Sequence, residues 1–243
     1  MEPIYRQNFT LSHIHVDRFG RAKLSVLLYF AQEVAGQHCT DLATDLQNRH
    51  LFWAVIRHRV QITRLPVLGE TITVETWPMP TTRVAFPRSV VAYDAAGNEV
   101  FRSISLWVLM DTRTRAMILP GKSGIAVTGT VRGTELAVPN SLVPRSHSNR
   151  VCRTVGFTEL DVNGHMNNTR YLDWVSDLLP SAYHQSRPVR EFTICYLAEA
   201  LEGQEISLDW ELTQGPVLQV DAHRQSPEDP SKTERVFSVQ IEY

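Results

Sequence analysis

The stretch Asp161-Val162-Asn163-Gly164-His165 has a partner at Asp17-Arg18-Phe19-Gly20-Arg21, 144 positions earlier in the chain. Both stretches contain an Asp and a Gly that favour a turn, and each comes just before a segment with helical periodicity. A second match aligns Gly69–Val74 with Gly203–Leu208, 134 positions apart. Two matches in the same order and the same structural context predict that one unit occurs twice. The smaller second offset implies that the helical region of the second unit is about ten residues shorter.

The first unit is predicted to contain a strand, a long helix and four further strands. The helix runs from Leu24 to about Leu46 and is apolar on most of its faces, which is typical of a buried helix. The strands show alternating or β-branched sequence, and turn signals such as Asp94–Asn98 separate them. Their ranges are 4–15, 53–64, 70–77, 84–93 and 100–110. This order predicts an antiparallel sheet wrapped around one helix.

The same order of elements returns after a connector rich in glycine and proline. The second unit is predicted to begin with a strand at 150–160 and a helix at 168–179, which Pro180 ends. Four further strands are predicted at 191–197, 205–212, 217–224 and 233–243. We therefore expect an α+β protein with one domain at residues 1–118, a connector at 119–146 and a second domain at 147–243.

Composition and charge exclude several classes of protein. The 243 residues are 43% hydrophobic and 21% charged, as in an ordinary globular protein. Three cysteines are too few for a disulfide framework, and they form no Cys-x-x-Cys zinc motif. We expect a cytoplasmic protein outside the membrane, because neither a signal peptide nor a bilayer-spanning apolar stretch is recognisable. Residues 1–130 hold 14 Lys and Arg against 10 Asp and Glu, too small a basic excess to predict nucleic-acid binding.

Polar differences between the two units indicate where chemistry is located, because a duplicated scaffold needs only one catalytic set. The matched pairs, second unit first, are Asp161 with Asp17, Asn163 with Phe19, His165 with Arg21 and Glu199 with Leu65. Only the second set combines acid–base groups with hydrogen-bonding groups. Its loop is also expected to run into a helix N-terminus, where unpaired N–H groups would stabilise a developing oxyanion.

Simpler interpretations of the same residues stay open at this point. Asp161-x-Asn163-Gly164 is also an ordinary turn in which the side chains bond their own backbone. Asn167 or Asn168 is a suitable helix cap, and a single histidine is more often structural than catalytic. Glu199 could equally be a solvated strand end.

The run Asp161–Tyr171 closely resembles the signature of the acyl-acyl carrier protein (acyl-ACP) thioesterases, Asp-x-Asn-x-His followed by Asn-Asn and an aromatic residue. Segments 53–77 and 94–111 resemble the first half of that family, so the likeness covers nearly the whole chain. It implies a bacterial member with two tandem hotdog domains, each an antiparallel sheet wrapped around a long central helix. It also implies hydrolysis of fatty acyl-ACP to free fatty acid and carrier protein, without metal or organic cofactor. Its catalytic residues fall on Asp161, Asn163, His165 and Glu199, the last after Thr193 and Tyr196.

One departure from the family pattern narrows the mechanism. Plant members carry a cysteine directly after the catalytic glutamate, whereas this chain has Ala200. A cysteine nucleophile is therefore missing there, and we expect all three cysteines to be ordinary buried thiols. The hypothesis is attack by an activated water, with Glu199 as general base, directly or with His165. Asp161 is left with two alternatives, orienting the site or attacking as a nucleophile.

The resemblance also implies partners. A fatty acyl chain needs an apolar cavity, for which the first unit offers the aromatic candidates Phe30, Phe52, Trp53, Trp77 and Phe86. Acyl carrier protein is acidic, so the mildly basic first half, with Arg57 and Arg59 on one strand face, is the expected docking surface. A homodimer is considered as well.

Three rival functions follow from the same sequence. The nearest is an acyl-CoA thioesterase on the same fold, which would share the chemistry and differ in the carrier. A hotdog dehydratase of 3-hydroxyacyl thioesters is disfavoured by the Asp-x-Asn-x-His loop. A non-catalytic acyl-binding module would keep its ligand after loss of His165 or Glu199.

Overall fold

The computed structural model describes residues 3–227, 229 and 231–243, with the side chains of 41–44 set aside. It divides into two compact units, Met1–Pro139 and Asn140–Tyr243. Among the described residues, no helix is both long and apolar enough to cross a membrane.

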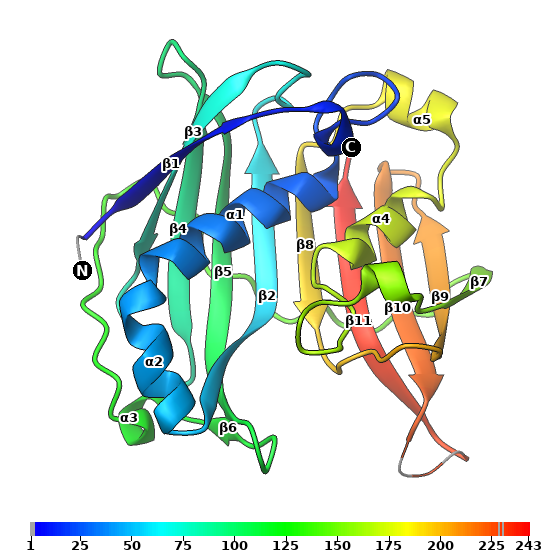
Figure 1. Cartoon of the computed structure of the whole chain (residues 1–243). Coiled ribbons are helices and arrows are strands. Elements are labelled where there is room, and N and C mark those ends of the chain that lie inside the picture. Colours follow the sequence, from blue (N-terminus) through cyan, green and yellow to red (C-terminus); the bar gives the residue numbers. More distant parts are fainter. Residues whose placement is uncertain (1–2, 228, 230) are drawn as a thin grey trace. The chain divides into compact units, whose positions relative to one another are not determined.

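The first unit is an antiparallel sheet with a helix lying across one of its faces (Figure 1). Its sheet has the order β1-β3-β4-β5-β2, and the short β6 pairs with β5. The strands are β1 (Tyr5–Thr10), β2 (Leu51–Ile62), β3 (Thr71–Pro78), β4 (Phe86–Tyr93), β5 (Glu99–Asp111) and β6 (Met117–Ile118). The helices are η1 (His13–His15), α1 (Leu24–His38), α2 (Thr40–Asn48) and α3 (Pro120–Ser123).

Helix α1 is buried on most sides, as its sequence predicts. Leu27, Leu28, Phe30 and Val34 are each 0% exposed, and Phe9 of β1 packs on Phe30 with ring centres 4.5 Å apart. The predicted single helix from Leu24 to Leu46 is wrong in one respect, because it breaks at Cys39 into α1 and α2. The hydroxyl of Thr40 donates to the backbone carbonyls of Gly36 and Gln37, so a side chain competes with the helical pattern at the break.

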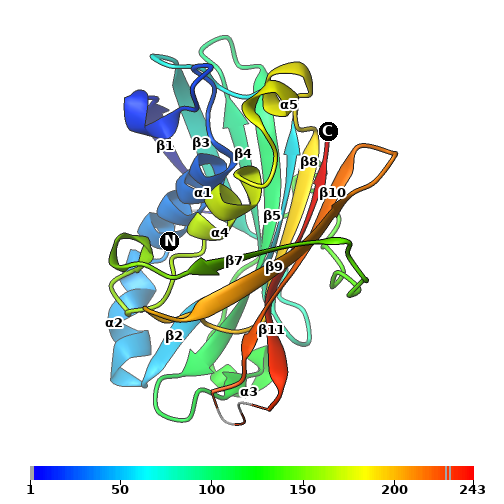
Figure 2. The same ribbon diagram turned by 90° about the vertical axis from the view of Figure 1, so that its right-hand side faces the viewer.

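The second unit repeats this arrangement with a shorter helix. Its sheet is antiparallel with the order β8-β11-β10-β9-β7, and α4 lies on one face of it (Figures 1 and 2). The strands are β7 (Asn149–Thr154), β8 (Glu191–Tyr196), β9 (Glu205–Leu212), β10 (Val217–Gln225) and β11 (Thr233–Glu242). The helices are η2 (Phe157–Glu159), α4 (Arg170–Ser176) and α5 (Ser181–Ser186). Tyr171 of α4 packs edge-on against Phe237 of β11, with ring centres 4.7 Å apart.

The first predicted strand of each unit is too long, and for the same reason. Strand β1 ends at Thr10 and β7 ends at Thr154, and each is followed by a turn of 3-10 helix, η1 or η2. In both units the backbone N–H of the last helical residue closes this turn. His15 N–H donates to the carbonyl of Ser12, and Glu159 N–H donates to the carbonyl of Gly156. The error is shared because the two units share the local structure.

The connector contains no helix or strand from residue 124 to residue 148, all of which the structure describes. Its first part packs on the first unit, where Arg132 pairs with Glu75 at 2.8 Å and Glu135 accepts a hydrogen bond from the indole of Trp77. Its last part is held in the second unit by Asp221, which accepts from His147 Nε2 at 2.9 Å. Side-chain hydrogen bonds therefore stabilise a segment that lacks secondary structure.

Candidate active site

The two loops that opened the sequence comparison have the same hydrogen bonds. In the second unit, Asp161 Oδ1 accepts from the backbone N–H of Asn163 at 2.8 Å and of His165 at 3.2 Å. In the first unit, Asp17 Oδ1 accepts from the N–H groups two and four residues later at 2.8 and 3.0 Å. The aspartate thus shapes the loop in both units, and its presence alone does not mark a site.

A backbone hydrogen bond brings a second segment to the loop. The N–H of Met166 donates to the carbonyl of Ala200 at 2.8 Å, and His165 forms an isolated antiparallel bridge with Leu201. The first unit has the matching bond from Ala22 to Pro66. The alignment of Glu199 with Leu65, inferred from sequence, therefore agrees with the backbone of both units.

This pairing places the side chains of His165 and Glu199 together. His165 Nε2 lies 3.3 Å from Glu199 Oε2, and the two side chains are 23% and 46% exposed. Each is thus open to a substrate while held by its backbone. The imidazole and the carboxylate together can accept a proton from water and return it to a leaving group.

Arg224 of β10 fixes the other side of Glu199, and sequence reasoning missed it. Its guanidinium donates to the Glu199 backbone carbonyl and to the Gln204 side chain, and it pairs with Glu234 on β11. An arginine within a strand carries no signal of this contact, because the contact depends on how the strand ends meet. Arg224 therefore holds the backbone at Glu199.

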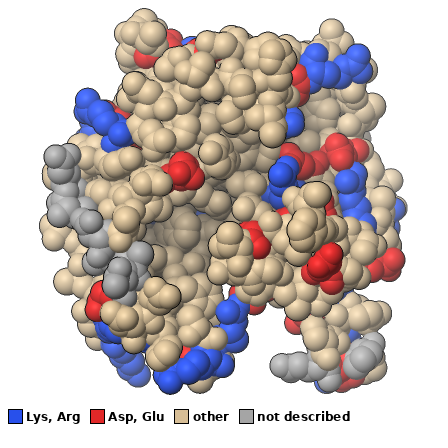
Figure 3. Space-filling view, in the orientation of Figure 1, with Lys and Arg blue, Asp and Glu red and all other residues tan. Residues whose placement is uncertain are grey.

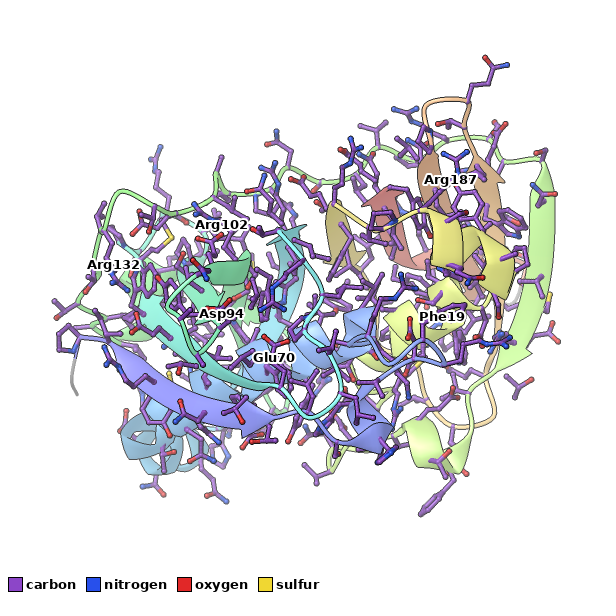
Figure 4. The ribbon with its side chains drawn as sticks, turned by 90° about the horizontal axis from the view of Figure 1, so that it is seen from above. Phe19, Glu70, Asp94, Arg102, Arg132 and Arg187 are labelled. Atoms are coloured by element: carbon purple, nitrogen blue, oxygen red, sulfur yellow. The ribbon has the colours of Figure 1, made fainter. Side chains whose placement is uncertain are left out.

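Asn163 is exposed at the tip of the loop. Its Nδ2 lies 3.5 Å from Asp161 Oδ2, a long contact that leaves the amide capable of other hydrogen bonds. The first unit has Phe19 in this place (labelled in Figure 4), and the Arg21 guanidinium lies 4.9 Å from the centre of its ring. In the described loop of the first unit, Arg21 stacked on Phe19 thus stands where the second unit has His165 and Asn163.

The helix that follows the loop is shorter than predicted, and the oxyanion site at its N-terminus stays a prediction. Helix α4 begins at Arg170, five residues after His165, and it is seven residues long rather than the predicted 168–179. The intervening Asn167 accepts from the N–H and the hydroxyl of Thr169, so the chain makes a separate turn before the helix.

The cysteines also differ from expectation, because only Cys195 is buried. Cys152 is exposed on β7, whose position at the sheet edge leaves its side chains open, and Cys39 is half-buried at the break between α1 and α2. The residue after Glu199 is the fully buried Ala200.

The first unit contains a pocket of about 140 Å³. Of the five aromatic candidates, Trp53 and Phe86 line it, whereas Phe30 and Trp77 are 0% exposed and form core. Phe52 lies instead under the Arg115 guanidinium, 4.8 Å from the centre of its ring. The other lining residues are Gln32, Ala35, Gly36, Cys39, Pro78, Pro87, Arg88, Trp107 and Val127.

Comparison with solved structures defines the class of fold. An acyl-ACP thioesterase from Bacteroides thetaiotaomicron superposes with a TM-score of 0.87 and 24% identity, over 99% of this chain and 97% of that one. A 12:0-ACP thioesterase from Umbellularia californica gives a TM-score of 0.81 at 22% identity, over 100% and 97%. The fold is therefore α+β and of the hotdog type, as expected from the sequence.

Family models identify the chain more closely. The models for the acyl-ACP thioesterase N-terminal and C-terminal domains match residues 2–119 and 144–235. The chain belongs to the acyl-ACP thioesterase family. A similar relative is the chloroplastic palmitoyl-acyl carrier protein thioesterase of Gossypium hirsutum, 25% identical over 81% of this chain and 52% of its own length. The chain spans about half the length of the curated relatives it matches.

Proposed function

We propose that this protein hydrolyses the thioester of fatty acyl-ACP, releasing free fatty acid and the carrier protein thiol. The observation that carries the proposal is the pair of His165 and Glu199, 3.3 Å apart, in the unit that matches the C-terminal family model. The matched positions of the first unit, Arg21 and Leu65, offer no such acid–base pair among the described residues.

The proposed reaction uses water as the nucleophile. Glu199, directly or with His165, takes a proton as water adds to the thioester carbonyl. Asn163 donates a hydrogen bond to the carbonyl oxygen as it gains charge. The tetrahedral intermediate then breaks its carbon–sulfur bond, and the proton held by the pair goes to the leaving thiolate. Asp161 holds the loop in this account and does not attack.

The pocket of the first unit is the proposed site for the acyl chain. Trp53, Phe86, Trp107 and Val127 give it a mainly apolar wall, which suits a chain of methylene groups. Bulk at these positions would then set the chain length that is accepted. Among the five candidates from sequence, the proposal keeps Trp53 and Phe86.

Acyl carrier protein is the proposed macromolecular partner, with a basic surface of the first unit as its docking site. Of the two arginines proposed from sequence, Arg57 is engaged, because its guanidinium donates to the Pro139 carbonyl at 3.1 Å. Exposed basic side chains gather instead along the lower edge of this unit, near α3 and β6 (Figure 3). They include Arg113, Arg115 and Lys122. The cytoplasmic location and the homodimer stay predictions from the sequence.

The proposal is tested by product analysis in a bacterial host. Expression of the wild-type chain should raise free fatty acid in the culture, and a Glu199→Ala variant expressed to the same level should not. With purified protein, hydrolysis of acyl-ACP at a higher kcat/KM than matched acyl-CoA supports the carrier assignment. The reverse order would favour the acyl-CoA thioesterase, and acyl binding without any hydrolysis would favour the binding module.

A further inference from the structure

A buried cation forms part of the wall of the pocket in the first unit. Arg88 of β4 is 6% exposed, and it lines the pocket beside the apolar side chains of Phe86 and Trp53. Burial lowers the pKa of this guanidinium, because a charge is poorly solvated there. An apolar pocket for a plain hydrocarbon chain has no need of such a group, and its desolvation costs stability.

The hydrogen-bond partners of Arg88 leave its charge without a carboxylate. Its guanidinium contacts His38 Nδ1 at 3.1 Å, the Thr76 hydroxyl at 3.2 Å and Cys39 Sγ at 3.1 Å. No carboxylate among the described side chains pairs with it. Arg88 differs in this respect from Arg102 and Arg132 of the same unit (labelled in Figure 4), because these two arginines pair with Glu99 and Glu75.

Two further N–H donors of the pocket residues lack acceptors. Gln32 Nε2 and Trp53 Nε1 are buried, and neither has a hydrogen-bond partner among the described residues. Both residues line the same pocket as Arg88. Buried donors are normally paired, since an unpaired one loses its bonds to water without replacement. The residues that line the pocket therefore carry two unpaired donors in addition to the positive charge of Arg88.

We propose that this pocket selects acyl chains that carry an oxygen acceptor, a carboxylate or a hydroxyl, on the part remote from the thioester. The inference rests on the proposed function, in which this pocket holds the acyl chain. A carboxylate would form charge-assisted hydrogen bonds with Arg88 and neutralise it. The desolvation of Arg88 has already occurred on folding, so the desolvation cost that remains on binding is that of the ligand. A methyl end would leave the cation and both free donors as they are.

Binding of three matched ligands tests the inference. The probes are pantetheine amides, which resist hydrolysis, with acyl chains of equal length that end in methyl, hydroxyl or carboxylate. Kd is measured by calorimetry for the wild-type chain and for Arg88→Met, Arg88→Lys and Gln32→Leu variants. The wild type should bind the carboxylate-ended or the hydroxyl-ended chain more tightly than the methyl-ended chain. The Arg88→Met variant should lower that preference roughly tenfold or more.

The preference is the ratio of two Kd values measured on the same protein preparation, so it does not depend on how much of the protein is folded. Arg88→Lys should retain part of the preference for the carboxylate, because it keeps a cation at this place. If Arg88→Met fails to fold, Gln32→Leu, at a half-buried position, should still reduce the preference for the hydroxyl-ended chain. A larger response of the carboxylate probe than of the hydroxyl probe to Arg88→Met would assign the ligand as an anion.

Two outcomes would overturn the inference, and they differ in what they say of the function. If the wild type prefers the methyl-ended amide and Arg88→Met leaves the ratio unchanged, the pocket does not select oxygenated chains. If acyl-ACP is hydrolysed in that case, the proposed function stands without the inference. If no amide binds and no acyl thioester is hydrolysed, both have failed.

Discussion

Asp161 and Asp17 hold their loops with the same pair of backbone hydrogen bonds, although only Asp161 lies in the candidate site. In each unit the Oδ1 atom accepts from the N–H groups two and four residues later, at distances between 2.8 and 3.2 Å. Asp17 makes these contacts in a unit that lacks the acid–base pair, so the structure of the loop is enough to explain them. This relationship supports the first of the two roles left open for Asp161, that of holding the site in place.

The first prediction compares Asp161→Ala with Asp17→Ala as a matched pair. Each should lower the free energy of unfolding by about 1 to 3 kcal/mol, because two backbone donors lose a charged acceptor. Asp161→Ala should also lower kcat, since its loop carries Asn163 and His165, whereas Asp17→Ala should not. Denaturant unfolding and steady-state hydrolysis measure the two effects. Loss of activity in Asp161→Ala without loss of stability would instead indicate a chemical role.

A second prediction concerns the oxygen that enters the product. In a single turnover in oxygen-18 water, the label should appear in the fatty acid and not in the Asp161 carboxylate, because water attacks directly. Mass spectrometry of the peptide that contains Asp161 measures this. Label in that carboxylate would mean that an acyl-aspartate intermediate had formed and been hydrolysed.

A third prediction separates pocket residues from core residues in the first unit. Trp53→Ala or Phe86→Ala should shift the product profile toward longer chains, since both side chains line the pocket. Trp77→Ala should mainly destabilise the fold, by about 3 to 5 kcal/mol, because that side chain is 0% exposed. Chain-length analysis and thermal unfolding of the three variants make the comparison. An unchanged profile in both pocket variants would remove the pocket from the account.

The sequence predicted the duplication, the order of the main helices and strands along the chain and the proximity of the Asp161–His165 loop to Glu199. These depend on local patterns and on the repeat, and the repeat supplies the long-range alignment that a single unit lacks. The bond from Met166 to Ala200 has its counterpart from Ala22 to Pro66, and this is why the alignment located Glu199.

Other features depend on contacts that no local pattern reveals. At the helix break at Cys39, the Thr40 hydroxyl bonds back to the preceding turn, a contact that the apolar periodicity does not show. The contact of Arg224 with Glu199 joins β10 to the segment between β8 and β9, 25 residues earlier in the chain. The charge of Arg88 inside an apolar pocket is equally invisible, because an arginine in a strand is expected to face water.

A fourth prediction uses His58 of β2, which is 1% exposed and whose Nε2 lies 3.1 Å from the Ser103 hydroxyl. Burial lowers the pKa of His58 from 6.5 to about 3. Between these values the unfolded chain binds a proton and the folded chain does not, so stability falls as the pH drops below 6.5. From pH 7 to pH 5 this histidine should account for a loss of about 2 kcal/mol.

The matched variant for this prediction is His58→Asn, which keeps a polar group without titrating. Its free energy of unfolding is lower at neutral pH, but it should lose less on going to pH 5 than the wild type loses. Denaturant unfolding at the two pH values gives the difference. Equal pH dependence in the two proteins would show that His58 takes up a proton in the folded state.

The central claim is that His165 and Glu199 together activate water for thioester hydrolysis. Its most direct test is the single-turnover rate of purified wild-type, His165→Ala and Glu199→Gln proteins on acyl-ACP. Each variant should be slower by roughly a hundred- to ten-thousandfold, with an unfolding midpoint close to that of the wild type. The double variant should be little slower than either single one, because the two groups act as a unit. Wild-type rates in a folded Glu199→Gln protein would contradict the account.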